Sequence, residues 1–138
     1  MKDLIEAVRK TPKLILGDKA DVYHNIDARK YLAEEGFAVF PDEYFSFVKY
    51  INGIRSDDGE LYAILPDEDK FGFNDAVFTN VSLNRPDKAK ISVLGENSFD
   101  YLVYDHEDHE YQFRDRVNDD ITYRFETFSQ AVSLLFSV

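Results

Sequence analysis

Residues 41–53 read PDEYFSFVKYING and carry the signals of a helix with a defined start and end. Pro41 suits the first turn, because its fixed φ and its missing N–H cost nothing there, while Asp42 and Glu43 favour the positive end of the helix dipole. Asn52-Gly53 supplies a left-handed stop. Between these signals, four apolar residues recur at helical spacing along one face: Tyr44, Phe47, Val48 and Ile51. The stretch therefore predicts an amphipathic helix that packs one face on a core.

The segments on either side of this helix also show clear periodicities. Residues 3–10 and residues 25–35 predict two earlier helices, and Gly36 is placed to end the second one. Residues 60–65 predict a strand after an Asp-Asp-Gly turn, and residues 75–83 predict a further helix. The first part of the chain is therefore expected to be mainly helical.

From residue 89 onward, short segments rich in aromatic and β-branched residues alternate with polar turns. The segments are KISVLG, YLVYD, EYQFRDR and ITYRFE, and their hairpin-length connections predict an antiparallel meander. Thr127 and Gln130 then match a capping box at the start of a last amphipathic helix. We therefore predict an α+β fold in a single domain, residues 1–138, with N-terminal helices, a mostly antiparallel sheet of about five to six strands, and a C-terminal helix packed on the sheet.

Composition narrows the class of protein. With 44% hydrophobic residues in 138, the chain has enough apolar side chains for a sizeable core. It contains no cysteine, so disulfides, thiolate metal sites and a cysteine nucleophile are excluded. The acidic first turn is unlike a signal peptide, and no apolar run reaches membrane-spanning length. We expect a soluble cytoplasmic protein without a membrane partner.

Net charge is the strongest compositional signal. The chain has 16 basic and 27 acidic residues, giving a net charge of −11, so a nucleic-acid partner would be repelled. The acids gather in residues 57–69 and again in residues 100–126. Such a charge either keeps a soluble domain dispersed or attracts a cationic partner, and composition alone leaves both interpretations open.

The sequence offers little catalytic chemistry. It contains no glycine-rich phosphate loop, no GxSxG elbow and no HExxH motif. His106 and His109, three residues apart among carboxylates, could bind a divalent metal if the segment turned suitably, but their place between two strands favours a solvated hairpin tip. We therefore expect no enzyme activity, no cofactor and no metal site, and a metal-dependent enzyme is the less favoured alternative.

The motifs together carry a family resemblance. The run Phe40-Pro41-Asp42-Glu43-Tyr44-Phe45-Ser46-Phe47-Val48, followed by Asn52-Gly53, resembles the (L/F)P-x-x-Y-x-x-F-(L/V)…NG helix that marks the SUKH superfamily of Smi/Knr-type proteins. Residues 93–96, 100–105, 110–111 with Asp115, and 125–128 are similar in order and spacing to the C-terminal strands and the closing F-x-(S/T)-F segment of that superfamily. Among its branches, the chain resembles the bacterial YrhA-like group. The resemblance covers residues 25–138, whereas residues 1–24 depart most from the pattern.

This resemblance implies a non-catalytic α+β domain that acts as an immunity protein, an antitoxin that binds and neutralises a cognate bacterial toxin. The sequence leaves open whether the protein is a monomer or a homodimer, which a C-terminal helix or an unpaired sheet edge could support. The acidity then suggests a basic toxin, such as a nuclease, as the protein partner. A regulatory or scaffold domain of the Smi/Knr type without a toxin is the alternative. The partner-binding hypothesis names the densest carboxylates: Asp57, Asp58, Glu60, Asp67, Glu68, Asp69, Glu107, Asp108 and Glu110. The residues expected to form the fold motif are Pro41, Tyr44, Phe47, Asn52, Gly53, Gly95, Asp100 and Phe128.

Overall fold

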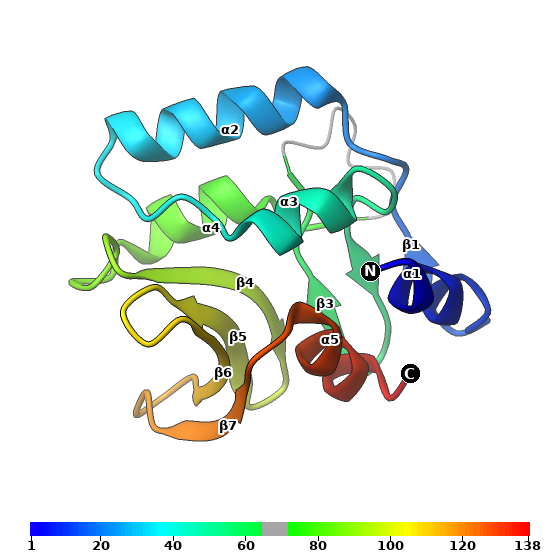
Figure 1. Ribbon diagram of the computed structural model, residues 1–138. Coiled ribbons are helices and arrows are strands. Elements are labelled where there is room, and N and C mark those ends of the chain that lie inside the picture. The colour runs from blue at the N-terminus through cyan, green and yellow to red at the C-terminus, as the bar shows by residue number, and fades with distance from the viewer. Residues whose placement is uncertain (65–71) are drawn as a thin grey trace.

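The computed structural model describes residues 1–64 and 72–138, which form five helices and seven strands (Figure 1). The helices are α1 (Lys2–Arg9), α2 (Val22–Glu34), α3 (Asp42–Val48), α4 (Ala76–Leu83) and α5 (Phe128–Phe136). The strands are β1 (Ile15–Leu16), β2 (Ile54–Arg55), β3 (Gly59–Leu61), β4 (Ile91–Asn97), β5 (Asp100–Asp105), β6 (Glu110–Asp115) and β7 (Ile121–Phe125).

All these strands lie in one sheet in chain order, and every neighbouring pair is antiparallel. The prediction of an α+β fold with an antiparallel meander is therefore confirmed. The described residues form seven strands instead of the predicted five to six. The difference arises at β1 and β2, because each has only two residues and is too short to show an alternating pattern.

The hydrophobic core lies between the sheet and the helices α3 and α5. Phe128 of α5 is fully buried, and its ring centre lies 5.4 Å from that of Phe47, 6.2 Å from that of Tyr44 and 5.7 Å from that of Tyr111 on β6. The predicted capping box of α5 is present, with Thr127 and Gln130 bonding each other's backbone. The expected packing of the C-terminal helix on the sheet is thus confirmed (Figure 1).

Helix α3 is shorter than the sequence pattern suggests. Pro41 is its N-cap residue, and its carbonyl accepts the N–H groups of Tyr44 and Phe45 at 3.1 and 3.3 Å. The helix ends at Val48, so Gly53 lies several residues beyond its C-terminus and does not cap it. Gly53 still has a left-handed backbone with φ of 101°, and an added Cβ would meet Phe73 at 3.0 Å.

The side chain of Asn52 bonds the backbone of Ile64 in the way that a neighbouring strand would. Its amide oxygen accepts the N–H of Ile64 at 2.7 Å, and its amide nitrogen donates to the carbonyl of Ile64 at 3.0 Å. Asn80 of α4 does the same for Val93, with distances of 2.9 and 2.8 Å. Each asparagine side chain therefore satisfies both backbone groups of a buried residue, as a neighbouring strand would.

Strands β3 and β4 approach closely at Gly95. A Cβ on Gly95 would lie 2.5 Å from the carbonyl oxygen of Glu60, so a larger residue requires the strands to separate. Asp100 begins β5 and is 9% exposed, with its N–H donated to the side chain of Asn97 at 2.7 Å. These contacts fix the register of β3, β4 and β5.

Residues 1–24 contribute to the same core and sheet. Helix α1 buries Leu4, Ile5 and Val8, and β1 pairs with β2 at the edge of the sheet. Helix α2 begins at Val22, three residues before the predicted start, because Asp21 caps it by accepting the N–H of Tyr23 at 2.7 Å. In the part of the chain that the structure describes, no helix combines the length and apolar character needed to span a membrane.

Candidate functional site

The acidic residues singled out from the sequence lie at opposite ends of the sheet. Asp57 and Asp58 occupy the turn between β2 and β3, beside the C-terminal end of β4, where Gly59 pairs with Asn97. Glu107 and Asp108 occupy the β5–β6 turn, beside the other end of β4, where Ile91 pairs with Asp105. The two sets are separated by the length of β4, roughly 20 Å, and do not form one acidic surface. Asp67, Glu68 and Asp69 lie outside the described residues.

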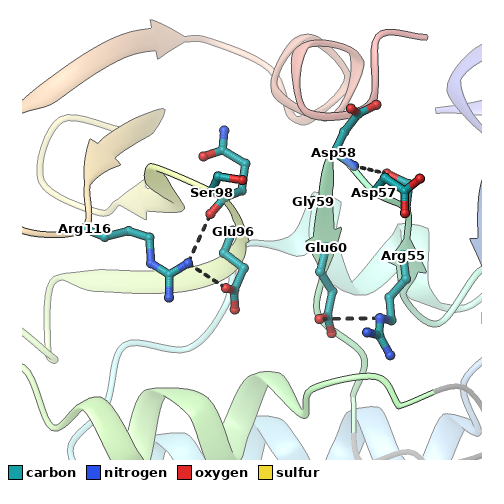
Figure 2. A pocket seen from close by; sticks show the side chains of 10 residues that line it. Arg55, Asp57, Asp58, Gly59, Glu60, Glu96, Ser98 and Arg116 are labelled. Atoms are coloured by element: carbon teal, nitrogen blue, oxygen red, sulfur yellow. Dashed lines mark hydrogen bonds and ion pairs between the residues drawn. The ribbon is translucent and has the colours of Figure 1, made fainter.

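At the β2–β3 end, Asp57 and Asp58 are exposed beside a shallow depression of about 270 Å³ (Figure 2). The opposite wall carries Arg116, which donates to Glu96 at 2.9 Å and to the carbonyl of Asn97 at 3.1 Å. Neither Asp57 nor Asp58 forms an ion pair with a residue that the structure describes. This end therefore presents two carboxylates, with the nearby cation of Arg116 already paired.

Glu60, although it belongs to the same acidic stretch, is only 8% exposed, and its side chain points away from Asp57 and Asp58 (Figure 2). Its carboxylate accepts the backbone N–H of Asn74 at 2.6 Å and the side-chain amide of Asn74 at 2.9 Å, and it lies 4.0 Å from Arg55. Burial raises the pKa of Glu60, which these hydrogen bonds partly oppose. Glu60 therefore ties β3 to the segment before α4 and is withdrawn from the partner-binding set.

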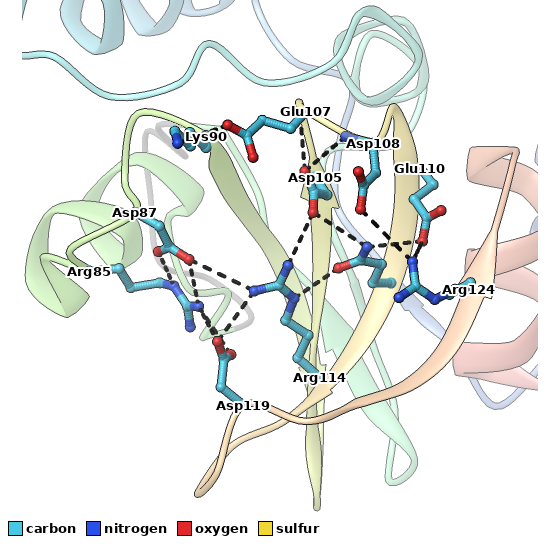
Figure 3. Close-up of polar contacts among 11 residues, drawn as sticks. Arg85, Asp87, Lys90, Asp105, Glu107, Asp108, Glu110, Arg114, Asp119 and Arg124 are labelled. Carbon is cyan, nitrogen blue, oxygen red and sulfur yellow. Dashed lines mark hydrogen bonds and ion pairs between the residues drawn. The ribbon is translucent and has the colours of Figure 1, made fainter.

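At the β5–β6 end, Glu107 and Asp108 are exposed and Glu110 is half-buried, and all three pair with cations on neighbouring segments (Figure 3). Glu107 lies 2.8 Å from Lys90, and Arg124 lies 3.9 Å from Asp108 and 2.8 Å from Glu110. The side chains of Glu107 and Asp108 are 63% and 57% exposed, against 21% for Glu110. Because ion pairs at such exposed positions contribute at most about 1 kcal/mol, Glu107 and Asp108 can exchange their cations for those of a partner.

A buried ion pair between Asp105 and Arg114 anchors the base of the β5–β6 turn. Asp105 accepts the N–H groups of Glu107 and Asp108 with one oxygen, at 2.9 and 3.1 Å, and pairs with Arg114 through the other at 3.2 Å. Arg114 also donates to Gln112, which is fully buried, at 2.8 Å. The β5–β6 turn is therefore fixed at its base while its acidic side chains project into solvent.

The network extends to the connection between α4 and β4. Arg85 bonds Asp87 and Asp119, each at 2.9 Å, and Arg114 reaches Asp119 at 3.3 Å. The hydrogen bond with Arg85 lowers the pKa of Asp87, and the same bond raises the pKa of Arg85. Sequence reasoning missed this network because Asp119 lies 34 positions from Arg85, so the connection that carries Arg85 and Asp87 meets the β6–β7 turn only in the folded chain. The one available signal was the alternation that places Gln112 and Arg114 on the same face of β6.

The two histidines of the turn have different surroundings. His106 is hydrogen-bonded through Nε2 to Ser92 Oγ at 2.8 Å, and its ring packs edge-on against Tyr104 with centroids 4.8 Å apart. Burial lowers the pKa of His106. His109 is exposed, with a left-handed backbone. Among residues 1–64 and 72–138, no three His, Asp or Glu side chains are arranged to hold a metal ion, so the metal-site alternative gains no support from the geometry.

A second depression, of about 460 Å³, adjoins the β5–β6 end. Its walls come from α2, the start of α3, and the strands β5 and β6. The ring centres of Tyr104 and Tyr111 lie 4.8 Å apart, and the hydroxyl of Tyr111 donates to Glu43 at 3.0 Å. No sequence motif pointed to this arrangement, because its residues come from separate elements.

Comparisons with known proteins assign no family. No protein-family model matches this chain, and no curated protein matches it. The likeness to the SUKH superfamily therefore stays a prediction from sequence motifs.

Proposed function

We propose that this protein is a SUKH-type immunity protein that binds and neutralises a cognate bacterial toxin with a basic surface. The observation that supports the proposal most is the β5–β6 end, where exposed carboxylates stand on a turn anchored by the buried Asp105–Arg114 pair. The order of SUKH-like motifs in the sequence provides the second line of support.

An anchored turn is well suited to binding another protein. Association costs free energy for every side chain and loop that must become ordered, and a turn that is already fixed reduces this cost. Asp105 fixes the backbone of Glu107 and Asp108 through two hydrogen bonds. The backbone that carries their carboxylates therefore needs no further ordering when the partner arrives.

The charge of the whole chain supports the same partner chemistry. A net charge of −11 creates a field that attracts a cationic surface and raises the association rate at low ionic strength. Toxins that cleave nucleic acid need a basic surface to hold phosphates, so an acidic protein can cover that surface. Neutralisation then occurs by occlusion and requires no chemical step in this protein.

The proposal is tested by co-expressing the protein with the product of the gene immediately upstream in a host that this product kills or arrests. We expect rescue of growth, together with a one-to-one complex that weakens as salt concentration rises. A chain carrying the buried-core change Phe128→Asp, which should not fold, is the control for effects of expression alone. If the intact protein neither rescues growth nor forms the complex, the proposal fails in favour of a regulatory or scaffold domain.

A further inference from the structure

The depression beside the β5–β6 end combines aromatic faces with a carboxylate. Its lining includes Tyr104 and His106 from β5 and the following turn, Tyr111 from β6, and Glu43 from the first turn of α3. The two tyrosine rings and the histidine ring meet at edge-to-face angles, with Tyr104 in the middle of the three. Aromatic rings and the carboxylates of Asp42 and Glu43 therefore converge on one depression from elements far apart in the chain.

Glu43 is held in position without being neutralised. Its Oε1 accepts the hydroxyl of Tyr111 at 3.0 Å, and no cation of a described residue lies within ion-pairing distance of its carboxylate. A hydrogen bond from a neutral phenol orients the carboxylate and leaves its charge and its second oxygen for another donor. The carboxylate of Glu43 is therefore positioned to form a charge-assisted hydrogen bond with a cationic group from outside the described residues.

Arg29 lines the same depression and shows the kind of group that such a surface holds. Its guanidinium carbon lies 3.9 Å from the centre of the Phe45 ring, and one of its nitrogens lies 3.2 Å from a carboxylate oxygen of Asp42. Arg29 is therefore already engaged by an aromatic face and a carboxylate. The depression offers a second set of the same two features, with the half-buried Tyr104 in place of Phe45 and the exposed Glu43 in place of Asp42, while the fully buried Tyr111 orients Glu43.

We propose that this depression is a binding site for an arginine side chain of the partner protein, with its guanidinium on the Tyr104 ring and paired to Glu43. A planar guanidinium can stack on an aromatic ring and bond a carboxylate at the same time, whereas a lysine ammonium is a more strongly hydrated point charge. The site adds a specific anchor to the proposed function, and it rests on that proposal only for the identity of the protein that carries the arginine. The net negative charge of the chain favours the same occupant.

The test uses small probes and therefore does not depend on any toxin. The ¹⁵N-labelled protein is titrated with N-acetyl-arginine amide, and backbone amide shifts are followed by NMR. N-acetyl-citrulline amide, which has nearly the same shape without the charge, is the matched probe. We expect saturable shifts at Tyr104, His106 and Tyr111 with the arginine probe, and binding at least about fivefold weaker with the citrulline probe.

Three variants assign the contact. Glu43→Gln removes the charge but keeps an oxygen that can accept the hydrogen bond from Tyr111. Tyr104→Leu removes the central ring. Each variant should bind the arginine probe about fivefold more weakly. Glu6→Gln, an exposed change on α1, should leave binding unchanged. If Tyr104→Leu loses the dispersed spectrum of a folded protein, Glu43→Gln alone decides the result. Equal binding of the two probes, binding unaffected by Glu43→Gln, or shifts confined to Asp57 and Asp58 would each overturn the proposal.

Discussion

The guanidinium of Arg114 lies 3.2 Å from the carboxylate of Asp105, and each of these side chains retains only 11% of its exposure. The pair joins β6 to the end of β5 and supports the acidic turn between them (Figure 3). A buried charge that loses its partner remains desolvated without compensation, so this relationship predicts a large effect of breaking it.

Replacing Arg114 with Met should therefore lower the free energy of unfolding by about 3–5 kcal/mol, measured by urea denaturation. The same substitution at Arg116, whose pair with Glu96 is more exposed, should cost only about 1 kcal/mol. Adding Asp105→Asn to Arg114→Met should recover part of the loss, because the remaining carboxylate is no longer charged. Similar losses for Arg114→Met and Arg116→Met would show that burial does not strengthen the Asp105 pair.

Asn80 should be essential for stability because it satisfies both backbone groups of Val93. Replacing Asn80 with Leu leaves the N–H and C=O of Val93 buried without these partners, and we expect a loss of about 2–4 kcal/mol. Hydrogen exchange at the Val93 amide should accelerate in the same variant, beyond the general change in stability. An unchanged exchange rate at Val93 relative to other β4 amides would contradict this role.

The same substitution at Asn25 should act in the opposite direction. Asn25 is 4% exposed, and neither polar atom of its side chain has a hydrogen-bond partner among the described residues. Asn25→Leu exchanges an unsatisfied amide for an apolar side chain of similar volume, so the free energy of unfolding should rise by about 1–3 kcal/mol. A decrease in urea denaturation would mean that Asn25 has a hydrogen-bond partner in solution.

Stability should also depend on the protonation of His106. Burial lowers the pKa of His106 below 6.5, and the charge of His109 acts in the same direction, while Asp105 opposes it. Below pH 6.5 the unfolded chain therefore binds a proton on this side chain more readily than the folded one, and the free energy of unfolding falls by up to about 1.4 kcal/mol per pH unit.

Urea denaturation at several pH values between about 7.5 and 5 tests whether the free energy of unfolding falls as the pH falls. The contribution of His106 is fully present above pH 6.5 and is lost as the pH falls toward its lowered pKa. His106→Gln should remove this part of the slope, whereas His109→Asn, at an exposed left-handed position, should retain most of it. An equal slope in His106→Gln and the parent protein would contradict the assignment.

The sequence predicts local features of this fold well where one segment determines them. The capping box at Thr127, the strand segments that became β5 and β6, and the helical stripe of α3 each depend on neighbouring residues, and each is found. The sequence cannot indicate features that arise from pairing across the chain. The side-chain bridges of Asn52 and Asn80 belong to this class, because the residues they bond lie 12 and 13 positions away.

The candidate site follows the same rule. Composition identifies the acidic stretches, but only the strand register places Asp57 and Glu107 at opposite ends of β4. Glu60 belongs to the acidic stretch by sequence and to the interior by structure, because Asn74 binds its carboxylate. The aromatic depression is invisible to motif analysis, since Glu43 and Tyr111 are 68 positions apart and meet only in the folded chain.

The central claim, that the acidic β5–β6 end captures a basic toxin, is tested most directly by neutralising each end of the sheet separately. Glu107→Gln with Asp108→Asn removes two charges at the β5–β6 end, and Asp57→Asn with Asp58→Asn removes two at the other end. The measurement is the association rate of each variant with the toxin at low and high salt. We predict that the first pair slows association severalfold and flattens its salt dependence, while the second pair has a much smaller effect. Equal effects of the two double variants on the association rate, or a larger effect of the changes at Asp57 and Asp58, would contradict the account.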